Sequence, residues 1–308
     1  ALLGFVQFIQ QAGPAAFGLH RAFFRSFGSF DQPNPYAGYL NMVIPLAAVM
    51  ALKAEQRWER MLYWGSTALM VFALLASQSR GAFLAAVVAA AVLCWCLFRA
   101  ARPLLGLAFL AAVTFLLADA FGVISSSSIS SVMASVGLGN VAFGNVTDAN
   151  FSAVERAAHW LAGVRMFAAH PILGVGIGNY AAAYPAFHPR GWYASLQHAH
   201  NYYINIAAEA GIIGLTSYTL LVGSALWYSY AIVRRARDTV CFAVALGSLG
   251  ALVATDFHNI FDVLYVHGMA TLLGAILALA PAGRHVDGAT RHLWRMGNGQ
   301  RTESGSNR

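Results

Sequence analysis

The chain has 308 residues, of which 58% are hydrophobic and 10% are charged, and its mean hydropathy is +0.59. A soluble domain carries about 25% charged residues, so this composition excludes an ordinary soluble protein and predicts a polytopic membrane protein. The net charge of +7 does not indicate nucleic-acid binding, because the basic residues gather at the ends of apolar runs. The three cysteines lie inside apolar runs, which favours buried packing over redox or metal chemistry.

The expected fold is an all-α bundle of transmembrane helices. The chain opens within an apolar run, "ALLGFVQFIQ", without a methionine, so residues 1–11 are expected to be the remnant of an earlier span of an N-terminally truncated chain. Apolar runs of about 18 residues mark further spans. We predict seven of them, near 36–53, 61–77, 81–98, 104–121, 211–233, 240–257 and 262–280.

The distribution of basic residues predicts the orientation of these spans. Thirteen of the 19 lysines and arginines fall on one set of connectors and on the tail, which the positive-inside rule assigns to the cytoplasm. The predicted organisation is therefore a remnant plus four spans over 1–121, a periplasmic loop over 122–199, three spans over 200–281 and a disordered cytoplasmic tail over 282–308. The protein is expected in the inner (cytoplasmic) membrane of a bacterium, with its functional face toward the periplasm or exterior.

The long loop divides into two parts. Its first part, "ISSSSISSVMASVGLGN", is rich in serine and glycine and is expected to be mobile. Its second part, "SAVERAAHWLAGVRMFAAHP", has helical apolar spacing, with Ser152 able to cap the start and Pro171 after the end. We predict an amphipathic helix near 152–169 that lies at the membrane surface.

Arg80, in "SQSRGAF", is a single cation in the short turn between two predicted spans. It is expected to open a helix, where a positive charge is unfavourable because the helix N-terminus already carries partial positive charge. A bound anion would remove this conflict, since free amides and the guanidinium would converge on it. The alternative is an arginine that reaches toward lipid headgroups.

Arg156 lies four residues before Trp160 on the predicted surface helix, so its guanidinium can stack on the indole ring. One interpretation is a second anion-binding arginine that faces the phosphate of a lipid carrier. The other is simple attraction of an interfacial helix to headgroups.

A polar stripe follows in "QHAHNYYINIAAEAGIIG", where Asn201, Asn205 and Glu209 are spaced by four residues. His200 directly precedes the first residue of this stripe. A neutral histidine can accept a proton from a hydroxyl group. A hydrogen-bonded interfacial histidine is the alternative. We expect no metal at His198 and His200, because no carboxylate or cysteine stands at ligand spacing nearby.

Two further motifs favour structural roles. "HPILGVGIGNY" (170–180) lacks the context of a nucleotide-binding loop and predicts a tight re-entrant turn with close backbone approach. "DFHNIFDVLYVHG" contains Asp256, His258, Asn259, Asp262 and His267, for which a hydrogen-bonded helix break is favoured over a cation site or proton relay.

Together, these pieces resemble the O-antigen ligase/O-antigen polymerase family of bacterial membrane glycosyltransferases. The resemblance spans roughly residues 29–262. It is carried by the matching stretches "SFDQPNPYAGYL", "SQSRGAFLA", "ERAAHWLAGVRMFAAHPILGVGIGNY", "HAHNYYINIAAEAGIIGL" and, more loosely, "FHNIFD".

The resemblance implies a C-type glycosyltransferase-like membrane fold that transfers a glycan from undecaprenyl diphosphate to an acceptor hydroxyl. Arg80 and Arg156 match the family's diphosphate arginines, and His200 matches its proposed base. We add Trp160, Arg165, His198 and the polar stripe as substrate-binding candidates. The family chemistry is expected to invert the anomeric centre without a metal or other cofactor.

The acceptor is left open by the sequence. The expected partners are membrane lipids, a carrier-linked glycan donor and a glycan or lipid A–core acceptor. Polymerase or protein O-oligosaccharyltransferase activity is the alternative within the same chemistry. A membrane transporter is the alternative from another class, but the distinctive charges lie at one edge rather than along a midplane path.

Overall fold

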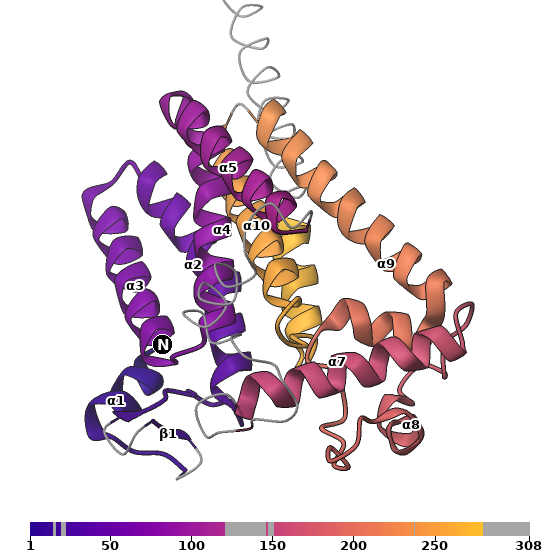
Figure 1. The fold of residues 1–308 in the computed structure, drawn as a ribbon. Helices are drawn as coiled ribbons and strands as arrows, with labels where there is room; N and C mark the ends of the chain where they lie inside the picture. The colour runs from indigo at the N-terminus through magenta and orange to yellow at the C-terminus, as the bar shows by residue number, and fades with distance from the viewer. Residues whose placement is uncertain (15–16, 20–22, 121–145, 147–150, 237, 280–308) are drawn as a thin grey trace, which may run out of the picture.

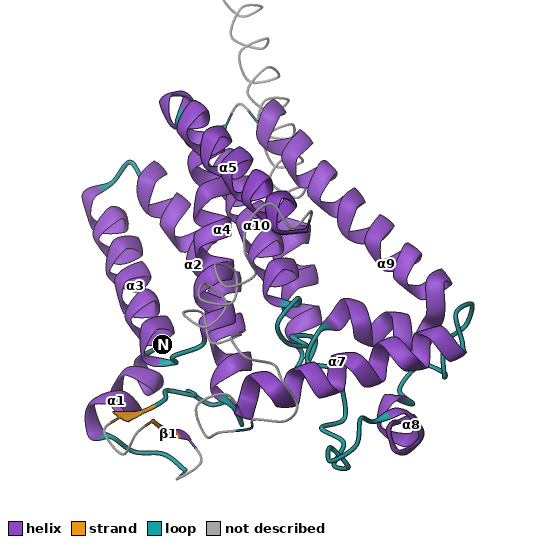
Figure 2. Cartoon of the chain, viewed as in Figure 1, coloured by secondary structure: helices purple, strands orange, loops and turns teal. Residues whose placement is uncertain are grey.

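The computed structural model describes residues 1–14, 17–19, 23–120, 146, 151–236 and 238–279. Within these ranges the regular secondary structure is helical, apart from an antiparallel pair of two-residue strands, β1 (Gly18–Leu19) with β2 (Phe23–Phe24) (Figure 2). The whole predicted serine-rich segment and the whole predicted tail lie outside the described residues. The described helices are α1 (Leu2–Gln10), α2 (Pro33–Lys53), α3 (Arg57–Ala76), α4 (Arg80–Leu97), α5 (Arg102–Ala120), α7 (Phe151–Ala169), α8 (Tyr180–Phe187), α9 (Tyr202–Arg235) and α10 (Thr239–His258), with a 3₁₀ turn at Arg99–Ala101 and a last helix, Met269–Leu279.

Four of the described helices, α2, α4, α9 and α10, are long and apolar enough to cross a membrane. The protein is therefore an all-α polytopic membrane protein, as the composition predicted. α3 and α5 occupy two more of the predicted spans.

The last helix starts later than the predicted span over 262–280, because residues 262–268 are irregular. The Asp262 side chain accepts a hydrogen bond from the N–H of Val263, at 2.9 Å. The Asn259 side chain likewise accepts from the N–H of Leu264, at 3.0 Å. These local bonds compete with helical ones and break the helix at this point.

α10 forms the centre of the bundle and packs chiefly against α2, α4 and α9. Small residues allow the closest of these approaches: a Cβ added at Gly247 would lie 2.6 Å from the Cα of Leu46, and one added at Gly250 would lie 2.7 Å from the Cβ of Pro45. Close packing across glycine is a usual means of helix association in membranes, where helices gain little from apolar burial alone.

One end of the bundle gathers the distinctive motifs. α7 runs across this end and packs against α8 and α9 (Figure 1). The start of α9 is joined to the end of α10 by a hydrogen bond from the N–H of Tyr202 to the carbonyl of Asn259, at 2.8 Å. The start of α4 meets the same place, since a Cβ on Gly81 would lie 3.2 Å from the His258 ring.

Candidate active site

The turn before α9 holds His200 in a defined position. His200 itself has a left-handed backbone, with φ at 51°. The Asn201 side chain caps α9 by accepting a first-turn N–H at 3.0 Å, and the Asn205 side chain accepts the N–H of Ala199 at 3.0 Å. From the other side, Trp160 Nε1 donates to the His200 carbonyl at 3.2 Å. Three of the predicted substrate-binding residues therefore fix the backbone around His200, and their contact with substrate stays a prediction.

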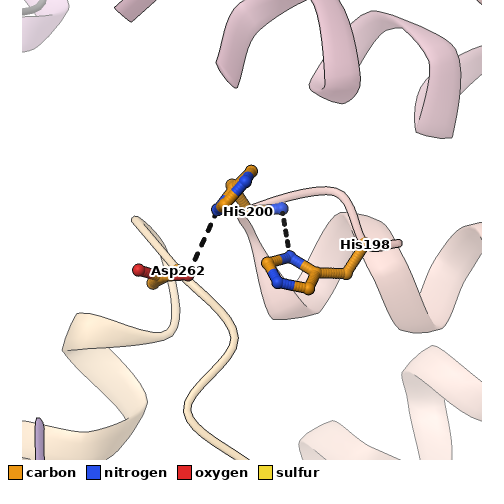
Figure 3. A group of neighbouring side chains, drawn as sticks. All are labelled: His198, His200 and Asp262. Atoms are coloured by element: carbon orange, nitrogen blue, oxygen red, sulfur yellow. Dashed lines mark hydrogen bonds and ion pairs between the residues drawn. The ribbon is translucent and has the colours of Figure 1, made fainter. Parts of the chain in front are cut away.

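The His200 ring is paired with a carboxylate from the loop after α10 (Figure 3). His200 Nδ1 and Asp262 Oδ1 lie 3.2 Å apart, and only 17% of the His200 side chain and 8% of the Asp262 side chain are exposed. Burial alone would raise the pKa of Asp262, but its hydrogen bond with His200 and the charges of His200 and Arg156 outweigh burial and lower this pKa below its ordinary value. Asp262 is therefore an anion at neutral pH, and it favours the His200 tautomer with a proton on Nδ1 and a lone pair on Nε2.

His198 supports the same turn as a neutral ring. Its Nδ1 accepts the backbone N–H of His200 at 3.2 Å (Figure 3). Burial, aided by the nearby charge of His200, lowers the pKa of His198 to about 4. Ligand atoms of His198, His200 and Asp262 lie within 4.8 Å of one another and form a possible metal-ligand set. The sequence argument against such a set was incomplete, because it could not place Asp262 beside the two histidines.

A buried aromatic platform lies beneath this turn. His159 on α7 stacks on Tyr184 with ring centroids 4.6 Å apart, and its ring centroid is 6.0 Å from that of His200. Burial, with the charges of His200 and His198, lowers the pKa of His159 to about 4, so this ring is neutral. The Tyr180 hydroxyl donates to the His159 carbonyl at 2.7 Å and fastens α8 to α7.

The two predicted anion-binding arginines, Arg80 and Arg156, both influence the pKa of Arg25, as Asp262 does. Arg80 is the exposed first residue of α4, and Arg156 is half-buried on α7. Burial lowers the pKa of Arg25 to about 10, and the positive charges of Arg156 and Arg80 add to this lowering, while Asp262 opposes it. The charge of Arg156 also lowers the pKa of Asp262, so this arginine influences both Arg25 and the His200–Asp262 pair. In the part of the chain that the structure describes, the expected stacking of Arg156 on Trp160 is not seen.

Arg165, also a predicted site residue, forms its hydrogen bonds with the end of α8 and not with the His200 turn. Its Nη1 donates to the carbonyls of Phe187 and His188 at 3.2 and 3.3 Å, at the end of α8. This arginine therefore neutralises the carbonyl end of a short helix. Its role as a substrate contact stays a prediction.

The glycine-rich segment docks onto a kink in α9. The N–H groups of Val175 and Gly176 donate to the Ala208 and Glu209 carbonyls, both at 2.9 Å. The Glu209 side chain in turn accepts the N–H of Tyr180 at 3.1 Å. Gly211 interrupts α9 with φ 62° and ψ −160°, and a Cβ there would overlap the Ile172 carbonyl. The close backbone approach expected from the glycines is thus made to a helix.

Replacing Gly211 with alanine should destabilise the protein, because the new Cβ meets backbone and the residue must keep a conformation that L side chains rarely adopt. We expect a loss on the order of 1–3 kcal/mol, measured as a lower unfolding midpoint of the detergent-solubilised protein. Gly223→Ala is the matched control, since it lies in the same helix and a Cβ there meets nothing within 4 Å. Equal midpoints for the two variants would contradict the assigned role of the kink.

Three polar residues of this region were not identified as site residues from the sequence: Asp262, Asn34 and Arg25. Asn34 Nδ2 donates to Asp262 Oδ2 at 3.0 Å, across 228 positions of the chain. Asn34 and Asp262 do lie within the matching stretches "SFDQPNPYAGYL" and "FHNIFD". The two motifs could therefore have pointed to these residues, but nothing in the sequence indicates that Asn34 and Asp262 are hydrogen-bonded to each other.

Comparison with known families gives a match over half of the chain. The sequence model of a family described as O-antigen ligase matches residues 65–219, which include α4, α7, the glycine-rich segment and the His200 turn. A search of curated proteins finds no match to the chain.

Proposed function

Because the chain belongs to the O-antigen ligase family, we propose that it transfers a glycan from an undecaprenyl diphosphate donor to an acceptor hydroxyl at the periplasmic face of the bacterial inner membrane. Membership of this family supports glycan transfer in general, without identifying the donor or the acceptor. The observation that supports the finer proposal is the pairing of His200 with Asp262, 3.2 Å apart, at the end of the bundle where α4 begins and α7 crosses.

His200 is the proposed general base. With Asp262 accepting the Nδ1 proton, Nε2 is the atom that takes the proton of the acceptor hydroxyl. The hydroxyl oxygen then attacks the anomeric carbon of the donor sugar. As this bond forms, the bond from the anomeric carbon to the diphosphate oxygen breaks, and its electron pair leaves with undecaprenyl diphosphate. A single displacement of this kind inverts the anomeric centre.

Arg80 and Arg156 are the proposed diphosphate ligands. Negative charge grows on the leaving oxygen as the glycosidic bond breaks, and guanidinium groups stabilise it with directed hydrogen bonds. Arg80 stands at the start of α4, so the free N–H groups of that helix add to the attraction for an anion. A diphosphate would also offset the repulsion that Arg156 and Arg80 exert on Arg25.

We expect transfer by the purified protein to persist in EDTA, because the arginines supply the charge that a divalent ion supplies in many other transferases. The measurement is product formation from a defined undecaprenyl-diphosphate glycan, with and without chelator. Loss of activity in EDTA that returns with a divalent ion would contradict this mechanism. It would instead assign the His198, His200 and Asp262 set to a metal.

The same assay distinguishes the acceptors. Lipid A–core, a second carrier-linked glycan and a pilin-type protein are supplied in turn with one donor. A product with lipid A–core supports ligation, one with the carrier-linked glycan supports polymerisation, and one with the protein supports O-glycosylation. Absence of product with all three, from protein that binds the donor, would count against a transferase.

A further inference from the structure

We propose that Arg25 and Asn34 are positioning residues, which hold the Asp262–His200 pair in register with the turn that carries Arg80. This inference rests on the proposed function, because it concerns how the base and the diphosphate arginines are placed relative to each other. Neither residue belongs to the matched segment 65–219.

Arg25 fastens the loop before α2 to the turn between α3 and α4. Its Nε donates to the carbonyl of Ser77 at 2.8 Å, three residues before Arg80. The next residue adds a backbone bond to the same place, from the Ser26 N–H to the Ala76 carbonyl at 3.0 Å. The end of α3 and the turn that leads to Arg80 are therefore tied to this loop by two independent hydrogen bonds.

Asn34 continues the connection to the base. Arg25 Nη2 donates to Asn34 Oδ1 at 2.9 Å. Arginine can only donate, so the amide oxygen of Asn34 must face it, and the amide nitrogen is turned toward Asp262 Oδ2, at 3.0 Å. Asp262 then uses its other oxygen for His200. A continuous series of hydrogen bonds thus links the Ser77 carbonyl to the imidazole.

The charge of Arg25 argues against a role as a mere anchor. Burial and the nearby charges of Arg156 and Arg80 all oppose a further cation at this point, and they lower the pKa of Arg25 to about 10. Asp262 is the anion that opposes this lowering. A neutral side chain would anchor the loop without that repulsion, whereas a cation gains the attraction of the Asp262 carboxylate, to which it is linked through Asn34.

The test is a double-mutant cycle with Asn34→Leu, which removes both of its side-chain hydrogen bonds and keeps the branched shape and the number of side-chain heavy atoms. We expect kcat for glycan transfer to fall by about 10- to 100-fold, the effect typical of a group that orients a catalytic ligand. Donor KM should change little. In a His200→Ala background, Asn34→Leu should have no further effect on the residual rate, because it acts through His200.

An Asn34→Leu variant that lowers the residual rate of His200→Ala by the same factor as the wild-type rate would overturn the proposal, as would an unchanged kcat. If Asn34→Leu does not fold, as judged by its unfolding midpoint, the same cycle is run with Arg25→Lys. That variant keeps the charge but lacks the fork that reaches both Ser77 and Asn34. A His200→Ala protein with full activity would instead remove His200 as the base, and absence of glycan transfer by the wild type would refute the proposed function itself, so these failures are distinguished.

Discussion

Replacing His200 with alanine should lower the rate of glycan transfer by about 10²–10⁴-fold, the usual contribution of a positioned general base. The reason is that His200 Nε2 is the proposed acceptor of the hydroxyl proton, while Nδ1 is held by Asp262 at 3.2 Å. The measurement is the initial rate of product formation by the purified variant at saturating donor and acceptor.

The control for this substitution is His267→Asn. His267 also has a left-handed backbone, with φ at 49°, which asparagine tolerates, and it lies near the exposed Asp31 rather than in the His200 turn. We expect this variant to keep nearly the wild-type rate. A His200→Ala protein as active as His267→Asn would remove His200 from the reaction.

Replacing Arg80 with alanine should lower the transfer rate by about 10²–10³-fold, as the loss of one preorganised donor to a developing oxyanion does in other enzymes. Arg80→Lys should recover part of this loss, because lysine keeps the charge but not the bidentate geometry. The rates of the two variants are compared in the same assay, each at saturating donor.

Arg57→Ala is the control for charge removal. Arg57 is the exposed first residue of α3, just as Arg80 is the exposed first residue of α4. Arg57 lies at the end of α3 that is far from Ser77 and from the turn that carries Arg80. We expect its rate to match the wild type. Equal losses for Arg57→Ala and Arg80→Ala would indicate a general effect of charge on membrane insertion instead of diphosphate binding.

The sequence was sufficient to predict the fold class and the local features of the site, because both depend on contacts between near neighbours. Apolar runs of span length predicted the membrane helices, and Arg80 does open α4. Gly174, Gly176 and Gly178 carry positive φ values, and a Cβ at Gly174 would overlap the backbone of α9, which is the close backbone approach that the motif predicted.

The network around the base could not be predicted in the same way. Asp262 is 62 positions from His200, and Asn34 is 228 positions from Asp262, so no local spacing joins them. The neutral state of His198 depends on burial, which a single sequence does not reveal. The Trp160 indole donates to the His200 carbonyl, a contact between α7 and the His200 turn that spacing along the sequence does not reveal.

The most direct test of the proposed mechanism separates donor binding from chemistry. It is the equilibrium affinity of the wild type, Arg80→Ala and His200→Ala proteins for an undecaprenyl-diphosphate glycan, measured without acceptor. We predict that His200→Ala binds the donor as the wild type does although it no longer transfers glycan, and that Arg80→Ala binds at least about tenfold more weakly, the loss of one charge-assisted contact. Wild-type affinity in Arg80→Ala, or lost affinity in His200→Ala, would contradict the assignment of the arginine to the donor and of the histidine to the acceptor.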